Sequence, residues 1–162
     1  MPARPTAGCA RPTFSRACGR SGGQDRGRLH VESTRAADAP FGDFGETRLA
    51  LGDRCLRLLV AETQGQRAQG LREVQSLVPY DGMIFVYESD TKARFTMANT
   101  PLPLDISFFD ADGKPVDQKR MTPCPTGSDA TCPIYASAHR FRYALERAAG
   151  APGGGALAAC GA

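Results

Sequence analysis

Residues 95–116 read FTMANTPLPLDISFFDADGKPV, and this stretch decides the fold class. From 104 to 109, apolar residues fall on every second position, which is the pattern of a strand with one buried face. The letters DADG at 110–113 are typical of a hairpin turn, and a returning strand begins at 115–116. A β-hairpin is therefore predicted, with a short strand before it at residues 95–97.

Two segments on the amino-terminal side also have strand character. Residues 55–60 (CLRLLV) alternate with period two, and residues 83–87 (MIFVY) are rich in β-branched and aromatic side chains. Between them, Thr63 followed by Gln66 fits a capping box, in which two side chains satisfy backbone donors at the start of a helix. One short helix is predicted near residues 64–73.

The remaining pattern sets the fold class and the domain boundaries. Residues 141–146 (FRYALE) alternate like a strand, although the same letters also suit a helix. Several short strands, regular turns and one helix predict a mainly β fold, as a compact β-sandwich or jelly-roll-like barrel. Residues 1–46 lack a periodic apolar pattern and are predicted to be disordered. One β-rich domain is expected at 47–150, followed by a Gly/Ala-rich tail at 151–162.

Composition excludes several classes of protein. The net charge of +3 comes from scattered arginines, so no nucleic-acid partner is expected. No run approaches the roughly 18 apolar residues of a transmembrane helix. The amino terminus is rich in arginine and has no apolar core, so no secretory signal peptide is expected in the sequence as written.

The six cysteines point to one candidate disulfide. Cys9, Cys18 and Cys160 lie in segments predicted to be unstructured, whereas Cys124 and Cys132 share one loop. A disulfide between these two is expected in an oxidising compartment, and free thiols in the cytosol. The loop thus favours an envelope or secreted protein, while the missing signal peptide leaves a cytoplasmic location open. Two thiols alone do not make a zinc site, and neither a metal nor a cofactor is expected.

The stretch at 95–116 resembles the core signature of the domain of unknown function 192 family. The residues in register with that signature are Phe95, Met97, Asn99, Thr100, Pro103, Leu104, Asp105, Ile106, Asp110 and Gly113. Motifs before and after it that also resemble the family include Arg67, Gly70, Leu71, Ser76, Leu77, Asp81, Gly82, Met83, Phe85, Cys124, Cys132, Tyr143, Leu145 and Glu146. The resemblance runs in consistent order over roughly residues 56–150.

This resemblance implies a β-sandwich or jelly-roll-like fold with one short helix, and it implies no reaction. Four features depart from the family pattern. Thr96 and Ala98 stand where the signature carries Trp and Lys, and Arg72 stands where Met is usual. The tail at 151–162 does not resemble the usual final helix and strand. A divergent or C-terminally truncated member, lacking the last strand, is therefore expected.

The motif polar residues supply the candidate ligand-binding site. Those residues are Arg67, Asp81, Met97, Asn99, Thr100 and Asp105. A corner formed by Asn99, Thr100 and Asp105 would hydrogen-bond a small polar ligand; alternatively, these side chains satisfy backbone groups at an irregular turn. Arg67 would hold an anion on the predicted helix, or it is simply solvated.

Three functional hypotheses follow. The first is non-enzymatic binding of a small polar molecule or a protein at the corner between Asn99 and Asp105. The second is a hydrolase that acts on a saccharide or envelope polymer through Asp81 and Asp105, because glycosidases place two carboxyl groups across the bond they break. The third is a degenerate copy without function. No catalytic residue is assigned, and whether the protein is an enzyme is left open.

Overall fold

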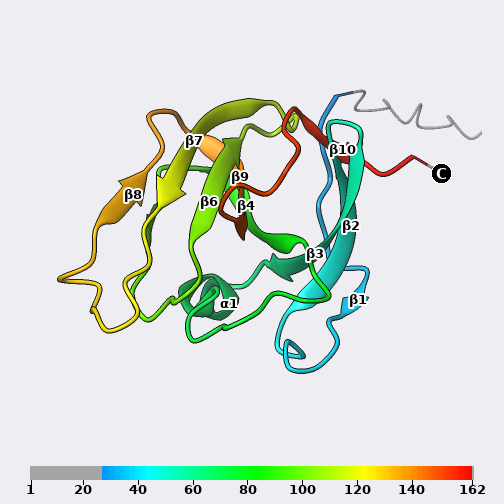
Figure 1. Ribbon diagram of the computed structural model, residues 1–162. Coiled ribbons are helices and arrows are strands. Elements are labelled where there is room, and N and C mark those ends of the chain that lie inside the picture. Colours follow the sequence, from blue (N-terminus) through cyan, green and yellow to red (C-terminus); the bar gives the residue numbers. More distant parts are fainter. Residues whose placement is uncertain (1–26, 162) are drawn as a thin grey trace, which may run out of the picture.

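The computed structural model describes residues 27–161, which form a mainly β fold with one short helix (Figure 1). The strands are β1 (Arg35–Ala36), β2 (Gly45–Leu51), β3 (Arg54–Ala61), β4 (Gly82–Thr91), β5 (Arg94–Thr96), β6 (Leu104–Phe109), β7 (Pro115–Met121), β8 (Ile134–Ala136), β9 (Phe141–Ala148) and β10 (Leu157–Ala159). The helix is α1 (Gln64–Gln69). In the described part of the chain, no helix is long and apolar enough to cross a membrane.

Eight strands form one curved sheet in the order β1-β2-β3-β4-β9-β6-β7, and β10 also pairs with β2 (Figure 1). The pairings are antiparallel except for β3 with β4, which run parallel because α1 makes the crossover between them. A second, two-stranded sheet joins β5 to β8. The mainly β class is confirmed, but the predicted barrel is not formed, since the sheet ends at β1 and β7 and does not close.

The predicted hairpin is present. Strands β6 and β7 pair antiparallel, and Gly113 has a φ of 80°, a backbone angle that glycine adopts without steric strain. The capping box is also present: the Thr63 hydroxyl accepts from the Gln66 amide, and the Gln66 side chain accepts from the Thr63 amide. The helix ends at Gln69 rather than near 73, because Gly70 has a φ of 50° and leaves the helical conformation.

The amino-terminal segment is more structured than its composition predicts. Residues 1–26 lie outside the described residues, but within 27–46 the chain forms β1 and the start of β2. Phe41 and Phe44 are buried in the core, and the Phe41 ring packs edge-on against Tyr80. The prediction of disorder up to residue 46 is therefore wrong for this part, since these two aromatic side chains bury enough apolar surface to hold it.

The carboxy-terminal tail supplies the strand that was expected to be missing. β10 pairs with β2, with Leu157 opposite Leu51, and the Leu157 side chain is buried. Beyond it, Cys160 forms a disulfide with Cys55 on β3, with a Cα–Cα distance of 5.5 Å. The expectation of a bare Gly/Ala tail without a final strand is wrong, because one leucine and one cysteine are enough to attach it.

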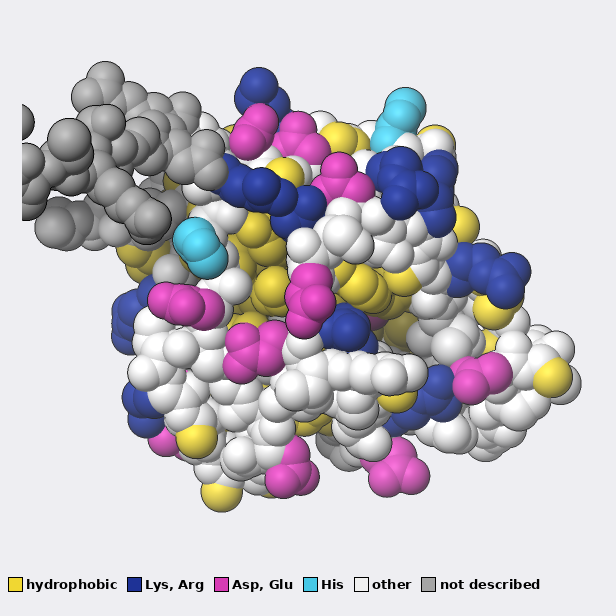
Figure 2. Space-filling view, turned by 180° about the vertical axis from the view of Figure 1, so that it is seen from behind, with side chains coloured by type: hydrophobic (Ala, Val, Ile, Leu, Met, Phe, Trp, Pro, Cys, Tyr) yellow, Lys and Arg dark blue, Asp and Glu magenta, His cyan; other side chains and the backbone are white. Residues whose placement is uncertain are grey.

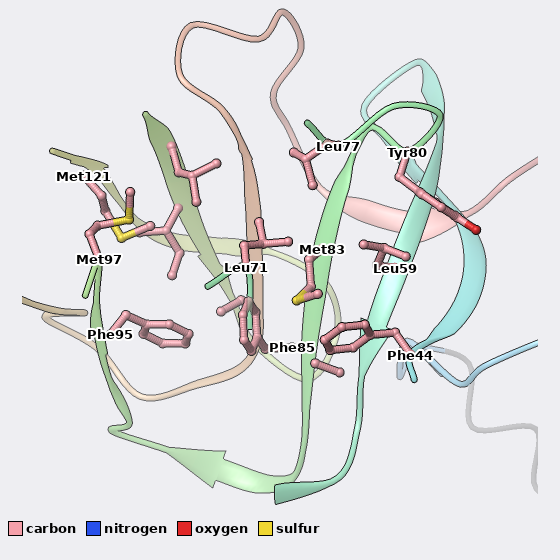
Figure 3. Packing of buried hydrophobic residues seen from close by; sticks show 14 of the residues in the cluster. Phe44, Leu59, Leu71, Leu77, Tyr80, Met83, Phe85, Phe95, Met97 and Met121 are labelled. Carbon is pink, nitrogen blue, oxygen red and sulfur yellow. The ribbon is translucent and has the colours of Figure 1, made fainter. Parts of the chain in front are cut away.

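The sheet buries a cluster of apolar side chains on each face. One includes Phe85, Phe95, Met97 and Met121, and Figure 3 shows these side chains converging with Leu71 from the segment after α1. The other includes Leu56, Leu58, Tyr143, Leu145 and Leu157. On β9, Ala144 belongs to the first cluster, whereas its neighbours Tyr143 and Leu145 belong to the second, so this central strand is buried on both faces.

The outer surface mixes charges of both signs. Figure 2 shows arginine and lysine side chains interspersed with aspartate and glutamate on that face, with apolar side chains reaching the surface between them. That face therefore carries no large patch of a single sign.

Candidate functional site

A cavity of about 640 Å³ lies beside α1 and the cluster that contains Phe85, Phe95 and Met97, and its volume falls in the range of small-molecule sites. Its apolar walls come from α1 and the turn after it, from β4, from β5 and the residue after it, from the start of β6, and from β8. The apolar side chains that line it include Leu71, Phe85, Phe95, Met97 and Leu104. Its charged side chains are Arg67, Arg72, Arg94, Asp129 and Glu146.

Glu146 is the buried carboxyl group of this cavity. It lies on β9 directly between Met83 of β4 and Ile106 of β6, so its side chain emerges on the apolar face of the sheet. The residue is 5% exposed, and its carboxyl group, which makes no hydrogen bond within residues 27–161, keeps its small exposed area toward the cavity. Burial raises the pKa of Glu146 to about 8, since the charged form loses its hydration. At neutral pH the group is a carboxylic acid.

Arg67 projects from α1 to the cavity wall. Its guanidinium donates hydrogen bonds to the carbonyl oxygens of Glu62 and Val86, and it lies 4.9 Å above the centre of the Tyr87 ring. Burial raises the pKa of that tyrosine to about 12. These contacts hold the guanidinium in one position at the edge of the cavity.

An ion pair joins two sides of the cavity. Arg72, just after α1, contacts Asp129 at 2.7 Å, and Asp129 belongs to the loop closed by Cys124 and Cys132. The predicted disulfide between these cysteines is confirmed, with a Cα–Cα distance of 6.1 Å. The loop is fixed at its start because the Asn99 amide donates to the Cys124 carbonyl at 3.0 Å.

The structure brings three of the predicted site residues into this cavity: Arg67, Met97 and Thr100. Asn99 is not among the lining residues. It is exposed, and its backbone hydrogen-bonds to Cys124 and Glu73. Its φ is 56°, a positive angle that Asn tolerates better than most residues. The Thr100 hydroxyl donates a hydrogen bond to the Ala98 carbonyl, so at least one polar side chain of the predicted Asn99–Asp105 corner satisfies a backbone group of the turn itself.

Asp105 faces the other side of the sheet from Leu104. Its carboxylate forms a bidentate ion pair with Arg120, with N–O distances of 2.8 and 3.1 Å, and accepts a hydrogen bond from the Gly150 amide. The Arg120 guanidinium lowers the pKa of Asp105. The residue lines a different cavity, of about 310 Å³, together with Arg147 and the glycines at 153–155.

Asp81 is not brought to Asp105. Its carboxylate accepts a hydrogen bond of 2.8 Å from the Arg57 amide, at the start of the parallel strand pair, and its side chain is exposed. It lines neither of the two cavities. Each carboxylate is thus occupied by a structural partner, and the structure does not place the two across one cleft.

Sequence reasoning missed Glu146 and Arg94. In the sequence, Glu146 stands out only through the family resemblance, because the alternation at 141–146 predicts that Phe141, Tyr143 and Leu145 form the buried face of that strand. A central strand is buried on both faces, and its charged residue then lies in the core. The position of β9 between β4 and β6 is what makes Glu146 a buried residue, and the sequence pattern does not show this position.

Thr96 also lines the cavity. This position is one where the chain departs from the family signature, which carries the larger Trp. Ala98, the other departure, is fully buried and forms a β-bridge with Cys124. Across residues 27–161, there is no group of three or more His, Cys, Asp or Glu side chains that could hold a metal ion.

Comparisons with known proteins place these features in a family context. Residues 47–153 match the model of the DUF192 family, described as "Uncharacterized ACR". A "putative transcription regulator" from Sinorhizobium meliloti 1021 is 26% identical, with a TM-score of 0.60 over 70% of this chain and 93% of that one. A protein of unknown function from Novosphingobium aromaticivorans DSM 12444 shares the fold at 24% identity, with a TM-score of 0.62 over 75% and 90%. No curated protein matches.

Proposed function

The chain belongs to the DUF192 family, whose description names no reaction, and from its own geometry we propose that it binds a small ligand in the cavity above Glu146 without transforming it. The observation that carries this proposal is the carboxyl group of Glu146, which lines the cavity and has no hydrogen-bond partner among residues 27–161. It is not one of the fully buried side-chain atoms without a partner, which within these residues are limited to Nε of Arg147, so the carboxyl group opens into the cavity. A ligand atom in the cavity can therefore hydrogen-bond to it directly.

The set of side chains around the cavity supports binding rather than catalysis. Glycosidases need two carboxyl groups, and nucleophilic enzymes need a nucleophile beside a base. The described residues that line this cavity include no Cys, His, Ser or Lys. The hydroxyls of Thr96 and Thr100 hydrogen-bond to the backbone of Ala98, and Asp129 is held by Arg72. The remaining groups, namely apolar walls with a few convergent polar side chains, are the usual composition of a small-molecule site.

A screen of small neutral and charged fragments tests the proposal. We expect some fragments to raise the melting temperature of the protein and to lose this effect in Thr96→Trp, because an indole at this lining position takes up part of the cavity. Thr122→Trp is the matched control, since Thr122 is exposed at the end of β7 and lies outside the cavity. Fragments that stabilise all three proteins equally would show that the cavity is not the site.

Two disulfides in one small domain support an oxidising compartment as the place where the protein works. Peptide mapping of the protein isolated from its own cells without reduction tests this location. Recovery of linked peptides containing Cys55 with Cys160 and Cys124 with Cys132 is expected. Recovery of these four residues as free thiols would contradict it.

A further inference from the structure

The lining of the cavity has an excess of positive charge. Arg72 is paired with Asp129, whereas Arg67 and the exposed Arg94 have no carboxylate within ion-pair distance in the described part of the chain. Two guanidinium groups that line one cavity attract anions, and the planar guanidinium matches the geometry of a carboxylate.

Arg67 is already oriented for such a contact. Its hydrogen bonds to Glu62 and Val86 both come from Nη1, so the donors on Nη2 and Nε have no partner among residues 27–161. Because the Tyr87 ring supports the guanidinium from below, little side-chain entropy is lost when an anion binds.

Around Glu146, the cavity favours an uncharged group of the ligand rather than an anion. Glu146 is surrounded by apolar side chains such as Phe85 and Leu104, and as a carboxylic acid it donates one hydrogen bond. The group that fits against it is a neutral acceptor, such as a carbonyl oxygen. A second carboxylate at this depth would require the burial of an unpaired charge.

Building on the proposed binding function, we infer that the cavity takes a small carboxylate with an apolar body. Its carboxylate lies at Arg67 and Arg94, and a neutral hydrogen-bond acceptor at its far end lies against Glu146. The two polar contacts are separated by the apolar walls, so they fix both the class of ligand and the direction in which it enters.

Calorimetric titration with three matched probes tests the sign of the charge. The probes are 4-(4-acetylphenyl)butanoate and the alcohol and amine that replace its carboxylate. We expect the carboxylate to bind about tenfold more tightly than the alcohol, and the amine to bind most weakly. In Arg94→Gln, the affinity for the carboxylate should fall to nearly that for the alcohol. The control is Arg48→Gln, a change at an exposed residue of β2 outside the cavity, which should leave the order of the three affinities unchanged.

A fourth probe, 4-phenylbutanoate, lacks the acetyl acceptor and should bind several-fold more weakly than its acetylated counterpart. That difference should be lost in Glu146→Leu. Equal affinities for the carboxylate and alcohol, or tighter binding of the amine, would overturn the inference while leaving the cavity as the binding site. Binding of none of the four probes would overturn both.

Discussion

Glu146 gives the protein a stability that depends on pH. Its pKa is raised to about 8 in the folded state, against about 4.3 in an unfolded chain, because burial disfavours the charged form. The folded protein therefore keeps a proton that the unfolded chain loses, and the stability present at pH 4 is lost as the pH rises towards 8. The charged and titratable groups around the cavity are Arg67, Arg72, Tyr87, Arg94 and Asp129.

Denaturant unfolding between pH 5 and pH 8 should reveal this group. We expect the free energy of unfolding to fall by up to about 1.4 kcal/mol per pH unit from Glu146 alone. The Glu146→Gln variant removes the titrating group and keeps the size of the side chain, so its stability should change less over the same range. Parallel pH profiles for the two proteins would contradict the burial of an acid at this position.

A second buried carboxylate behaves in the opposite way. Glu46 accepts hydrogen bonds from Arg57 and Tyr80, and the Arg57 guanidinium is the main cause that lowers the pKa of Glu46 to about 2. The stability that ionised Glu46 gives the folded protein is fully present above about pH 4.5 and is lost as the pH falls through 2.

Removal of Arg57 should be costly, because it leaves the Glu46 charge buried without its main partner. We expect Arg57→Ala to lower the free energy of unfolding at pH 7 by clearly more than a change at an exposed arginine that has no carboxylate partner. Arg48→Ala, on the neighbouring strand and exposed, should cost under about 0.5 kcal/mol. Chemical denaturation of both variants checks this, and similar losses would show that the ion pairs around Glu46 contribute little.

At the scale of single elements, sequence reasoning succeeded where the pattern is local. The capping box predicted where α1 begins, and the alternation at 104–109 with its turn predicted the hairpin. It failed where an element depends on a distant partner. β10 has only Leu157 to bury, and its attachment comes from β2 and from Cys55, which is 105 residues away from Cys160.

The two disulfides should therefore differ in their effect on stability. In the chain-entropy model, closing the 105-residue separation stabilises by about 4–5 kcal/mol, whereas closing the 8-residue separation stabilises by about 2–3 kcal/mol. We expect the double serine variant of Cys55 and Cys160 to lose more stability in urea than that of Cys124 and Cys132. A larger loss from the short loop would show that its contacts at the cavity matter more than chain entropy.

For the whole molecule, the sequence predicted the mainly β class and the single helix, but not the arrangement of the sheet. Three of the six candidate residues, Arg67, Met97 and Thr100, meet in one cavity, whereas Asp81 and Asp105 do not. The reason is that neighbouring residues of a strand face opposite sides, so Leu104 and Asp105 serve different cavities although they are adjacent in the sequence. Glu146 is a candidate site residue because β9 lies in the middle of the sheet, between β4 and β6, and this position is not visible in the sequence pattern.

The central claim is that the cavity above Glu146 is where a ligand binds, and intermolecular nuclear Overhauser effects test it most directly. The experiment uses protein labelled at Met and Val methyl groups together with 4-(4-acetylphenyl)butanoate. Met97 lines the cavity, whereas Val78 is exposed and lies outside it. We predict transfer from the aromatic protons of the probe to the Met97 methyl group and none to Val78. Transfer to Val78 alone, or to neither methyl group at saturating probe, would contradict the claim.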